Sequence, residues 1–104
     1  MESPKEIEHL DLRLDLTRAL AFRAGKPVAL TATEFRLLAA LVSQPGRIFT
    51  RPELVCAALG ENVKITKRAI DVHMVGLRRK LGAPGVIEAV RRHGYRVRAT
   101  DSNG

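Results

Sequence analysis

Cationic side chains are the residues of this 104-residue sequence whose type and placement best suit a chemical role. Between Lys64 and Arg98 there are ten Lys and Arg residues against two acidic residues, whereas the rest of the chain has eight basic and nine acidic residues. The excess positive charge, a net +7 for the whole chain, therefore lies in the C-terminal third. This segregation indicates a polyanionic partner. A basic surface that serves only solubility is the alternative.

Much of this charge belongs to a segment that is expected to be one helix, residues 66–81 (TKRAIDVHMVGLRRKL). Thr66 suits the N-cap, and Gly82 is a typical residue to follow the last turn. Cations in that last turn are favoured by the negative end of the helix dipole. Four apolar residues recur at helical spacing and predict a stripe that faces a core: Ile70, Met74, Leu77 and Leu81.

The opposite side of the same helix has an unusual composition for a face that meets only water. It is expected to present Arg68, Val72, Val75, Gly76 and Arg79. A helix fits the major groove of DNA, where the thymine methyl group would give the two valines an apolar partner. Gly76 would let the backbone approach the bases. The alternative, a helix buried on two sides, explains the valines but not the two arginines.

A second cationic group is expected at the tip of a β-hairpin. Residues 86–90 and 95–99 have the composition of strands, and Arg91-Arg92-His93-Gly94 has that of the turn between them. Arg91 and Arg92 would then lie at the minor groove, where narrow A·T-rich segments attract guanidinium groups. An exposed hairpin tip without a partner is the alternative.

The elements that must position these two groups are read from the first half of the chain. Leucines at positions 10, 12, 14 and 16 alternate with polar residues, and residues 19–23 and 28–30 flank a turn at 24–27, which together predict a small antiparallel meander. Thr31 and Glu34 have the spacing of a capping box, and Thr50 and Glu53 repeat it. Two helices are therefore expected. The first has the apolar stripe Phe35, Leu38, Leu41 and Val42 and ends at Gln44-Pro45-Gly46, and the second spans residues 51–59 and ends at Gly60.

The predicted fold class is α+β: a winged helix-turn-helix with an N-terminal antiparallel sheet, three helices and a C-terminal β-hairpin wing. Residues 1–6 are expected to be a linker or disordered start, residues 7–99 the domain, and residues 100–104 a disordered tail.

Other classes of function find little support in the sequence. Glu34 and Glu53 are better explained as capping residues than as an acid/base pair, and no phosphate-binding glycine loop or activated nucleophile is evident, so an enzyme is not expected. No cofactor and no metal are expected either, because His9, His73, His93 and Cys56 lack ligand spacing. Cys56 lies in an apolar run and is expected to be a buried thiol in a reducing compartment. With no apolar run of membrane-spanning length and no signal-peptide pattern at the start, a cytoplasmic protein is expected.

Three motifs, in this order and at this spacing, also resemble a known family. They are LTATEFRLLAAL with PGRIFTRPEL, then AIDVHMVGLRRKL, then VIEAVRRHGYR. They resemble the winged-helix output domain of OmpR/PhoB-type two-component response regulators, over about residues 12–98. The resemblance implies a four-stranded sheet, three helices and a hairpin that together bind DNA. The chain departs from the family pattern in having Arg92 where a glycine is common, Val75 or Gly76 where an arginine is frequent, and Leu59-Gly60 in place of tryptophan-glycine.

The resemblance also implies partners. Duplex DNA would be bound at direct repeats by a head-to-tail pair, and the loop Glu61, Asn62, Val63, Lys64 and Ile65 would face RNA polymerase. A receiver domain usually precedes this module in the family and is absent from the sequence. The chain is therefore expected to be either a piece of a longer regulator, with a receiver domain and a sensor kinase as partners, or a protein regulated by another route. No membrane partner is expected.

Phosphate contacts are expected around both groove-reading groups. Thr50 and Arg51 open the second helix, whose first N–H groups lack helical partners and can bind a phosphate oxygen. Tyr95 is expected to pack its ring on the core and to offer its hydroxyl to a phosphate. The remaining candidates for phosphate contact are Lys67, His73 and Arg78. A winged helix used for protein contacts, or an RNA-binding module, is the competing interpretation, although few aromatic residues are available to stack on single-stranded bases.

Overall fold

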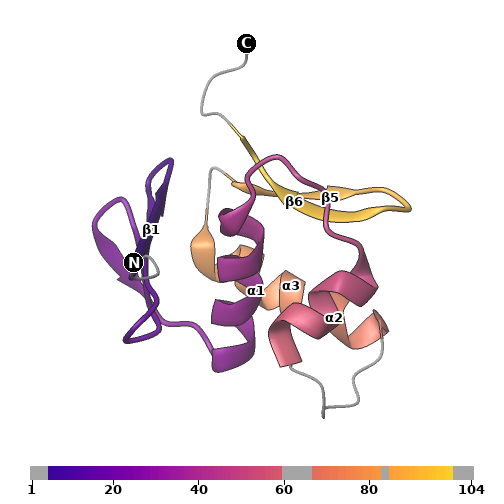
Figure 1. The fold of residues 1–104 in the computed structure, drawn as a ribbon, viewed down its shortest axis with the longest axis horizontal. Helices are drawn as coiled ribbons and strands as arrows, with labels where there is room; N and C mark the ends of the chain where they lie inside the picture. Colours follow the sequence, from indigo (N-terminus) through magenta and orange to yellow (C-terminus); the bar gives the residue numbers. More distant parts are fainter. Residues whose placement is uncertain (1–4, 60–66, 83–84, 100–104) are drawn as a thin grey trace.

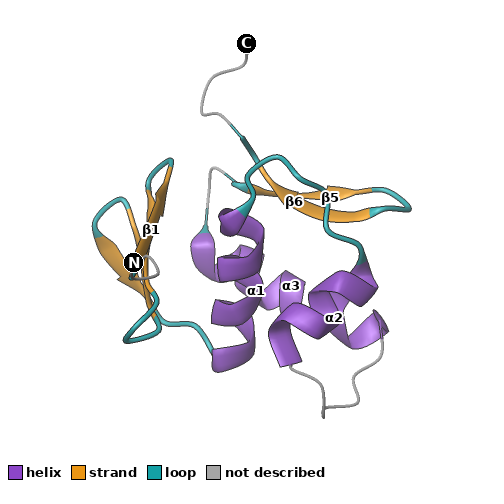
Figure 2. Ribbon diagram, in the orientation of Figure 1, coloured by secondary structure: helices purple, strands orange, loops and turns teal. Residues whose placement is uncertain are grey.

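The computed structural model describes residues 5–59, 67–82 and 85–99. Figures 1 and 2 show a sheet, three helices and a hairpin, in the predicted order. The elements are β1 (Glu6–His9), β2 (Leu12–Asp15), β3 (Leu20–Arg23), β4 (Lys26–Val28), α1 (Ala32–Ser43), α2 (Arg51–Leu59), α3 (Lys67–Leu81), β5 (Ile87–Val90) and β6 (Gly94–Val97). None of the helices in these ranges is long and apolar enough to cross a bilayer. Thr66, the predicted N-cap of α3, and Gly60 lie outside the described residues, as do residues 61–65.

The four N-terminal strands form one antiparallel sheet in sequence order, which agrees with the predicted meander and with the four strands that the family resemblance implies. Strand β1 (Glu6–His9) lies before the alternating leucines and was not predicted from them. Leu14 pairs with Ala21 across β2 and β3, and both are buried together with Leu12. Because side chains alternate between the faces of a strand, this register puts the apolar face of the sheet against the helices. In Figure 1 the sheet lies beside α1, on the side away from α2.

Two further details of the sheet differ from the sequence prediction. Leu10 lies in the turn between β1 and β2, with φ +57°, rather than in a strand. The turn before β4 contains only Ala24 and Gly25, both at positive φ (52° and 79°), so β4 begins at Lys26 rather than at Val28. Two positive-φ residues suit the twist of a two-residue hairpin. Pro27 is tolerated because β4 is an edge strand.

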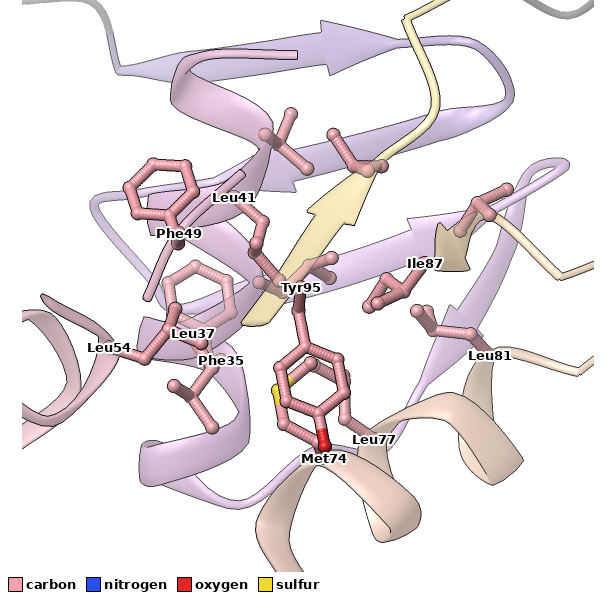
Figure 3. Packing of buried hydrophobic residues seen from close by; sticks show 14 of the residues in the cluster. Phe35, Leu37, Leu41, Phe49, Leu54, Met74, Leu77, Leu81, Ile87 and Tyr95 are labelled. Atoms are coloured by element: carbon pink, nitrogen blue, oxygen red, sulfur yellow. The ribbon is translucent and has the colours of Figure 1, made fainter. Parts of the chain in front are cut away.

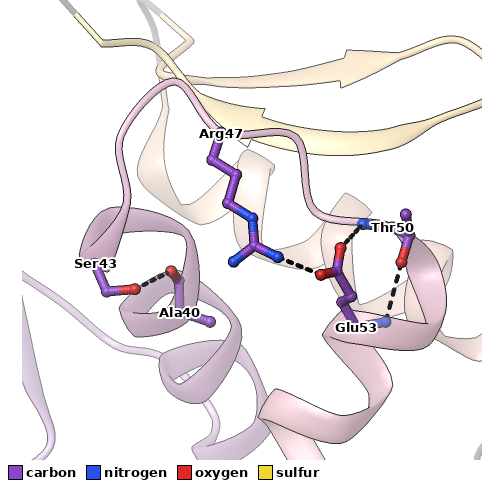
Figure 4. Close-up of polar contacts among 5 residues, drawn as sticks. All are labelled: Ala40, Ser43, Arg47, Thr50 and Glu53. Atoms are coloured by element: carbon purple, nitrogen blue, oxygen red, sulfur yellow. Dashed lines mark hydrogen bonds and ion pairs between the residues drawn. The ribbon is translucent and has the colours of Figure 1, made fainter.

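The two capping boxes are present. The Thr31 hydroxyl accepts from the Glu34 N–H (3.1 Å), while the Glu34 carboxylate accepts from the Thr31 N–H (2.9 Å). Thr50 and Glu53 make the same reciprocal pair at 3.2 and 2.9 Å, which Figure 4 shows at the start of α2. Each box satisfies N–H groups that have no helical partner, and so fixes where its helix begins.

The core is formed by side chains from all three helices and both sheets, several of which converge in Figure 3. The predicted stripe of α3 is buried, with Ile70, Met74 and Leu77 at 0% exposure. The predicted stripe of α1 is buried as well, but so is Leu37, which that stripe omits. Helix α1 contacts both β1 and β6, so it is covered on more than one side, and a single-stripe prediction misses part of its buried surface.

Cys56 is exposed, contrary to the prediction of a buried thiol. Leu54 and Ala58 are fully buried and, four residues apart, define the inward face of α2. Cys56 lies about 200° around the helix from Leu54 and therefore points outward. The sequence does not predict this orientation, because every residue of the run 54–59 is apolar and the pattern does not indicate which face of the helix is buried.

The hairpin of β5 and β6 is attached to the helices through Phe49. The Phe49 N–H donates to the Tyr95 carbonyl (2.7 Å), and the Tyr95 N–H donates to the Phe49 carbonyl (3.0 Å). Gly94, predicted to lie in the turn, is instead the first residue of β6, with φ +147°. A Cβ at Gly94 would lie 1.9 Å from the Phe49 carbonyl oxygen, so only glycine permits this close pairing.

Candidate nucleic-acid interface

The outward face of α3 exposes the two valines, as predicted. Val72 is 68% exposed and Val75 is 61% exposed, which makes them, with Leu20, the large hydrophobic residues exposed in the described parts of the chain. Arg68 and Arg79 are also exposed. Apolar side chains this open to water, with arginines on the same face, are typical of a surface that a partner covers.

The two arginines in the last turn of α3 are available for contacts with a partner, because a residue of the sheet binds the carbonyl groups at the end of this helix. Arg23, a buried arginine of β3, donates through Nη1 to the carbonyl oxygens of Leu81 (2.9 Å) and Gly82 (3.0 Å). Its Nε donates to the Asp11 carboxylate at 3.3 Å. The exposed Arg78 and Arg79 are therefore not required to cap the last carbonyls. They can turn toward an anionic partner.

Gly76 is directed toward α1 rather than outward, which argues against the predicted approach of its backbone to DNA bases. A Cβ at Gly76 would lie 2.7 Å from Oε2 of Glu34, so this position faces α1. Glu34 is 5% exposed, and its Oε1 accepts a 2.7 Å hydrogen bond from Nζ of Lys80. The missing side chain of Gly76 makes room for a buried carboxylate between the helices. The helical spacing by itself groups Gly76 with Val72, because it carries no information about the neighbouring helix.

The hairpin tip presents to solvent three residues that can carry positive charge. Arg91, Arg92 and His93 are all exposed, and the His93 N–H closes the turn on the Val90 carbonyl at 2.9 Å. In Figure 1 this tip extends outward on the side of α2. Arg92 has φ +68°, a left-handed conformation that costs an L-residue about 1 kcal/mol. This conformation explains why glycine suits the position.

Tyr95 has its ring buried, as predicted, but its hydroxyl proton is used within the protein rather than offered to a phosphate. The hydroxyl donates to Oδ1 of Asp71 at 2.6 Å. Nε of Arg51 donates to the same oxygen at 2.9 Å, and the Arg51 guanidinium lies 5.5 Å from the centre of the Tyr95 ring. Sequence reasoning missed this cluster. Its one signal was that Asp71 is the single acidic residue in the α3 sequence.

The charges in this cluster stabilise one another. Partial burial opposes ionisation of Asp71, but the hydrogen bonds from Tyr95 and Arg51 outweigh it and lower the pKa of Asp71 below its usual value. Burial, and next the hydrogen bond to Asp71, raise the pKa of Tyr95. The hydrogen bond to Asp71 chiefly raises the pKa of Arg51. The cluster therefore keeps a carboxylate, a guanidinium and a neutral phenol across the neutral pH range.

The start of α2 is a less open anion site than the sequence suggested. Thr50 is exposed, but its N–H and hydroxyl both take part in the capping box with Glu53. Figure 4 shows Arg47 paired with Glu53 at the same point. The Thr50 backbone hydrogen bond is the largest cause of the lowered pKa of Glu53. Thr50 and Arg51 thus lie at the rim of the surface, beside two carboxylates.

The remaining predicted contacts are placed as follows. His73 is half-buried on α3, and Lys67 is the first residue of that helix, with its side chain outside the described set. Within the described ranges, no group of three His, Cys, Asp or Glu residues is arranged to bind a metal ion. The candidate interface consists of the outward face of α3, the start of α2 and the tip of the hairpin.

Comparison with known proteins gives consistent matches. Residues 25–97 match the family model described as "Transcriptional regulatory protein, C terminal". The phosphate regulon transcriptional regulatory protein PhoB of Rhizobium meliloti (strain 1021) is 40% identical over 88 residues, which cover 82% of this chain and 39% of PhoB. The chain spans less than half the length of the curated relatives that it matches first.

Solved structures share the fold. The DNA-binding domain of CpxR from E. coli is 34% identical with a TM-score of 0.79, covering 94% of this chain and all of that domain (100%). The RstA DNA-binding domain of Klebsiella pneumoniae, solved in complex with the RstA box, is 29% identical with a TM-score of 0.79, covering 93% of this chain and 100% of that one. The predicted winged helix-turn-helix, with its N-terminal sheet and C-terminal hairpin, is thereby confirmed.

Proposed function

This chain belongs to the family of C-terminal domains of transcriptional regulatory proteins, and from that premise we propose that it binds duplex DNA sequence-specifically as the output domain of a bacterial response regulator. Its family is one of transcription regulators, not of enzymes. The RstA domain, which has the same fold, is bound to its DNA box in a solved structure.

The observation that carries the proposal is the exposed face of α3. Val72 and Val75 are largely open to water and lie on the same face as Arg68 and Arg79. In the major groove the valines would meet thymine methyl groups, and the arginines would reach guanine edges or phosphates. A protein partner would also accept the valines, but it would not account for the wider excess of positive charge in this third of the chain.

The hairpin extends the same surface. Arg91 and Arg92 at its exposed tip would enter or cover the minor groove, while α3 lies in the adjacent major groove. Phosphate contacts would come from the residues around these two elements: Thr50, Arg51, Lys67, His73 and Arg78. These contacts set the position of the domain on DNA, and the side chains in the grooves read the sequence.

The proposal includes further partners that only the family resemblance supports. A head-to-tail pair would bind direct repeats, the loop of residues 61–65 would face RNA polymerase, and a receiver domain under a sensor kinase would control the pair. The curated relatives are longer than this chain, which matches 39% and 36% of two of them, so each contains sequence outside this domain.

The test is to select binding sites from a random duplex pool and to measure affinity for the selected duplex as salt is varied. Neutralising about six phosphates predicts a slope of log K against log salt near −5, and a slope shallower than about −2 would count against duplex DNA. Arg79→Ala should weaken binding, whereas Arg18→Ala is a matched control, because Arg18 is an exposed arginine beside the N-terminal sheet. Competition by RNA and heparin separates this function from an RNA-binding or protein-binding module.

A further inference from the structure

Asp71 is a carboxylate at the point where three elements of the proposed interface meet. It lies on α3, and its Oδ1 atom accepts from Nε of Arg51 (2.9 Å) and from the hydroxyl of Tyr95 (2.6 Å). Arg51 is the first residue of α2, and Tyr95 belongs to β6 of the hairpin. One oxygen atom thus joins the helix proposed for the major groove to the hairpin proposed for the minor groove.

The hairpin has a separate attachment that does not involve α3. Phe49 pairs with Tyr95 through two backbone hydrogen bonds and lies just before α2. That pairing joins the hairpin to the segment before α2, whereas the hydrogen bond from Tyr95 to Asp71 joins it to α3. The side chain of Asp71 is 39% exposed, so the link lies at the surface rather than deep in the core.

The charge of Asp71 opposes DNA binding in general. The α3 sequence contains five basic residues and this one acid. A carboxylate on that helix repels phosphates, and by pairing with Arg51 it offsets a cation that would otherwise attract them. A helix that served only to bind polyanions would be better without it. Its hydrogen bonds to Arg51 and Tyr95, which join three elements, give it a geometric role instead.

We propose that Asp71 is a specificity-determining positioning residue, which fixes α3 and the hairpin at the spacing that one operator requires and weakens binding to all other DNA. The inference rests on the proposed function. Two reading elements that are held at a fixed spacing contact the correct site together, and random DNA gains nothing from that spacing. Loss of the link should therefore change the two affinities in opposite directions.

The experiment compares two duplexes of equal length, the one selected from the random pool and a scrambled one. In Asp71→Asn we expect affinity for the selected duplex to fall about tenfold, within the usual range of coupling between two sites. Affinity for the scrambled duplex should rise about threefold, because one repelling charge is gone. If Asp71 had no part in positioning, its replacement would change both affinities in the same direction, because the lost repulsion acts on any duplex.

Two further variants separate geometry from charge. Tyr95→Phe removes the hydroxyl that donates to Asp71 but retains the buried ring and the net charge. It should therefore lower affinity for the selected duplex about threefold and leave affinity for the scrambled duplex unchanged. Glu88→Gln is the matched control: Glu88 lies on β5, pairs with Arg96 at 2.8 Å and has a similarly exposed side chain (44%). It should raise both affinities by the same factor.

The outcomes distinguish the inference from the function on which it rests. If Asp71→Asn raises both affinities in parallel, as Glu88→Gln does, or if Tyr95→Phe retains the full preference, Asp71 is only a repelling charge and the inference fails. If the unmodified chain shows no preference between the duplexes, the proposed function itself fails. Circular dichroism and thermal melting verify that each variant is folded, and Tyr95→Phe decides the question by itself if Asp71→Asn does not fold.

Discussion

Nζ of Lys80, in the last turn of α3, donates a 2.7 Å hydrogen bond to Oε1 of Glu34, the third residue of α1. The same carboxylate oxygen accepts from the Thr31 N–H at 2.9 Å. Glu34 therefore fixes the start of one helix and the end of another. Because Glu34 is buried, this ion pair is a contact between α1 and α3 that lies largely out of solvent.

The ion pair predicts a pH dependence of stability. Burial opposes ionisation of Glu34, but the hydrogen bonds from Lys80 and Thr31 outweigh it and lower the pKa of Glu34 below the usual 4.5. A lowered carboxylate pKa contributes stability that is fully present above the unfolded value and is lost as pH falls through the folded value. Glu34→Gln, which can still form the capping box, should cost about 1–3 kcal/mol at pH 7 and much less near pH 3. Urea unfolding of both proteins across this range is the measurement. A difference that does not change with pH would contradict the ion pair.

Gly76→Ala should destabilise the domain, although alanine is the better helix former. The new methyl group would meet Oε2 of Glu34 at 2.7 Å, and that carboxylate is held by Lys80 and Thr31. We expect a loss of about 1–3 kcal/mol, which exceeds the gain of about 1 kcal/mol in helix propensity. Gly85→Ala is the control and should be nearly neutral, because a methyl group at that position would have nothing within 4 Å. A stabilised Gly76→Ala protein would show that the carboxylate moves freely.

Gly94→Ala should detach the hairpin. A Cβ there would lie 1.9 Å from the Phe49 carbonyl oxygen, and φ at this position is +147°. The Phe49–Tyr95 pairing has to open, at a cost of about 3 kcal/mol or more. Gly25→Ala, also at positive φ but with open space around it, should cost about 1 kcal/mol. Hydrogen exchange at the Phe49 and Tyr95 amides would report the detachment. Equal protection in Gly94→Ala and the unmodified chain would be inconsistent with it.

The exposed valines predict a response to single thymine methyl groups. Replacing thymine by uracil removes one methyl and retains every hydrogen-bonding group, so a contact with Val72 or Val75 should cost about 0.8 kcal/mol at one or two operator positions. Val72→Ala should make binding insensitive to the same uracil. Binding titrations on a uracil-substituted series measure this. If no position responds, the valines face protein rather than DNA.

The hairpin tip predicts a dependence on groove shape. Arg91→Ala should weaken binding by about 1–3 kcal/mol, and more on A·T-rich flanks than on G·C-rich flanks, because a narrow minor groove concentrates negative potential. His93→Ala, at the same exposed tip, is the control for disturbance of the turn and should have a smaller effect. An equal loss on all flanks would make Arg91 a phosphate contact.

The sequence by itself determined the features that depend on residues within one or two helical turns of each other. The capping boxes at Thr31 and Thr50 join residues three apart, and the spacing of Ile70, Met74 and Leu77 assigns opposite sides of α3 to core and surface. The exposure of Val72 and Val75 follows from the same 3.6-residue period. The order of elements follows from such local patterns taken in turn, and the charged C-terminal third is read directly from the sequence.

Only the tertiary structure decided which long-range pairs these elements bring together. Gly76 faces Glu34 rather than a ligand, and Tyr95 donates to Asp71 rather than to a phosphate. In each pair the residues are more than 20 positions apart, so their contact depends on how the elements pack, which no local period encodes. The predicted burial of Cys56 was wrong for a related reason. Which face of a short helix is buried depends on the elements packed against it, and in α2 the buried face contains Leu54 and Ala58.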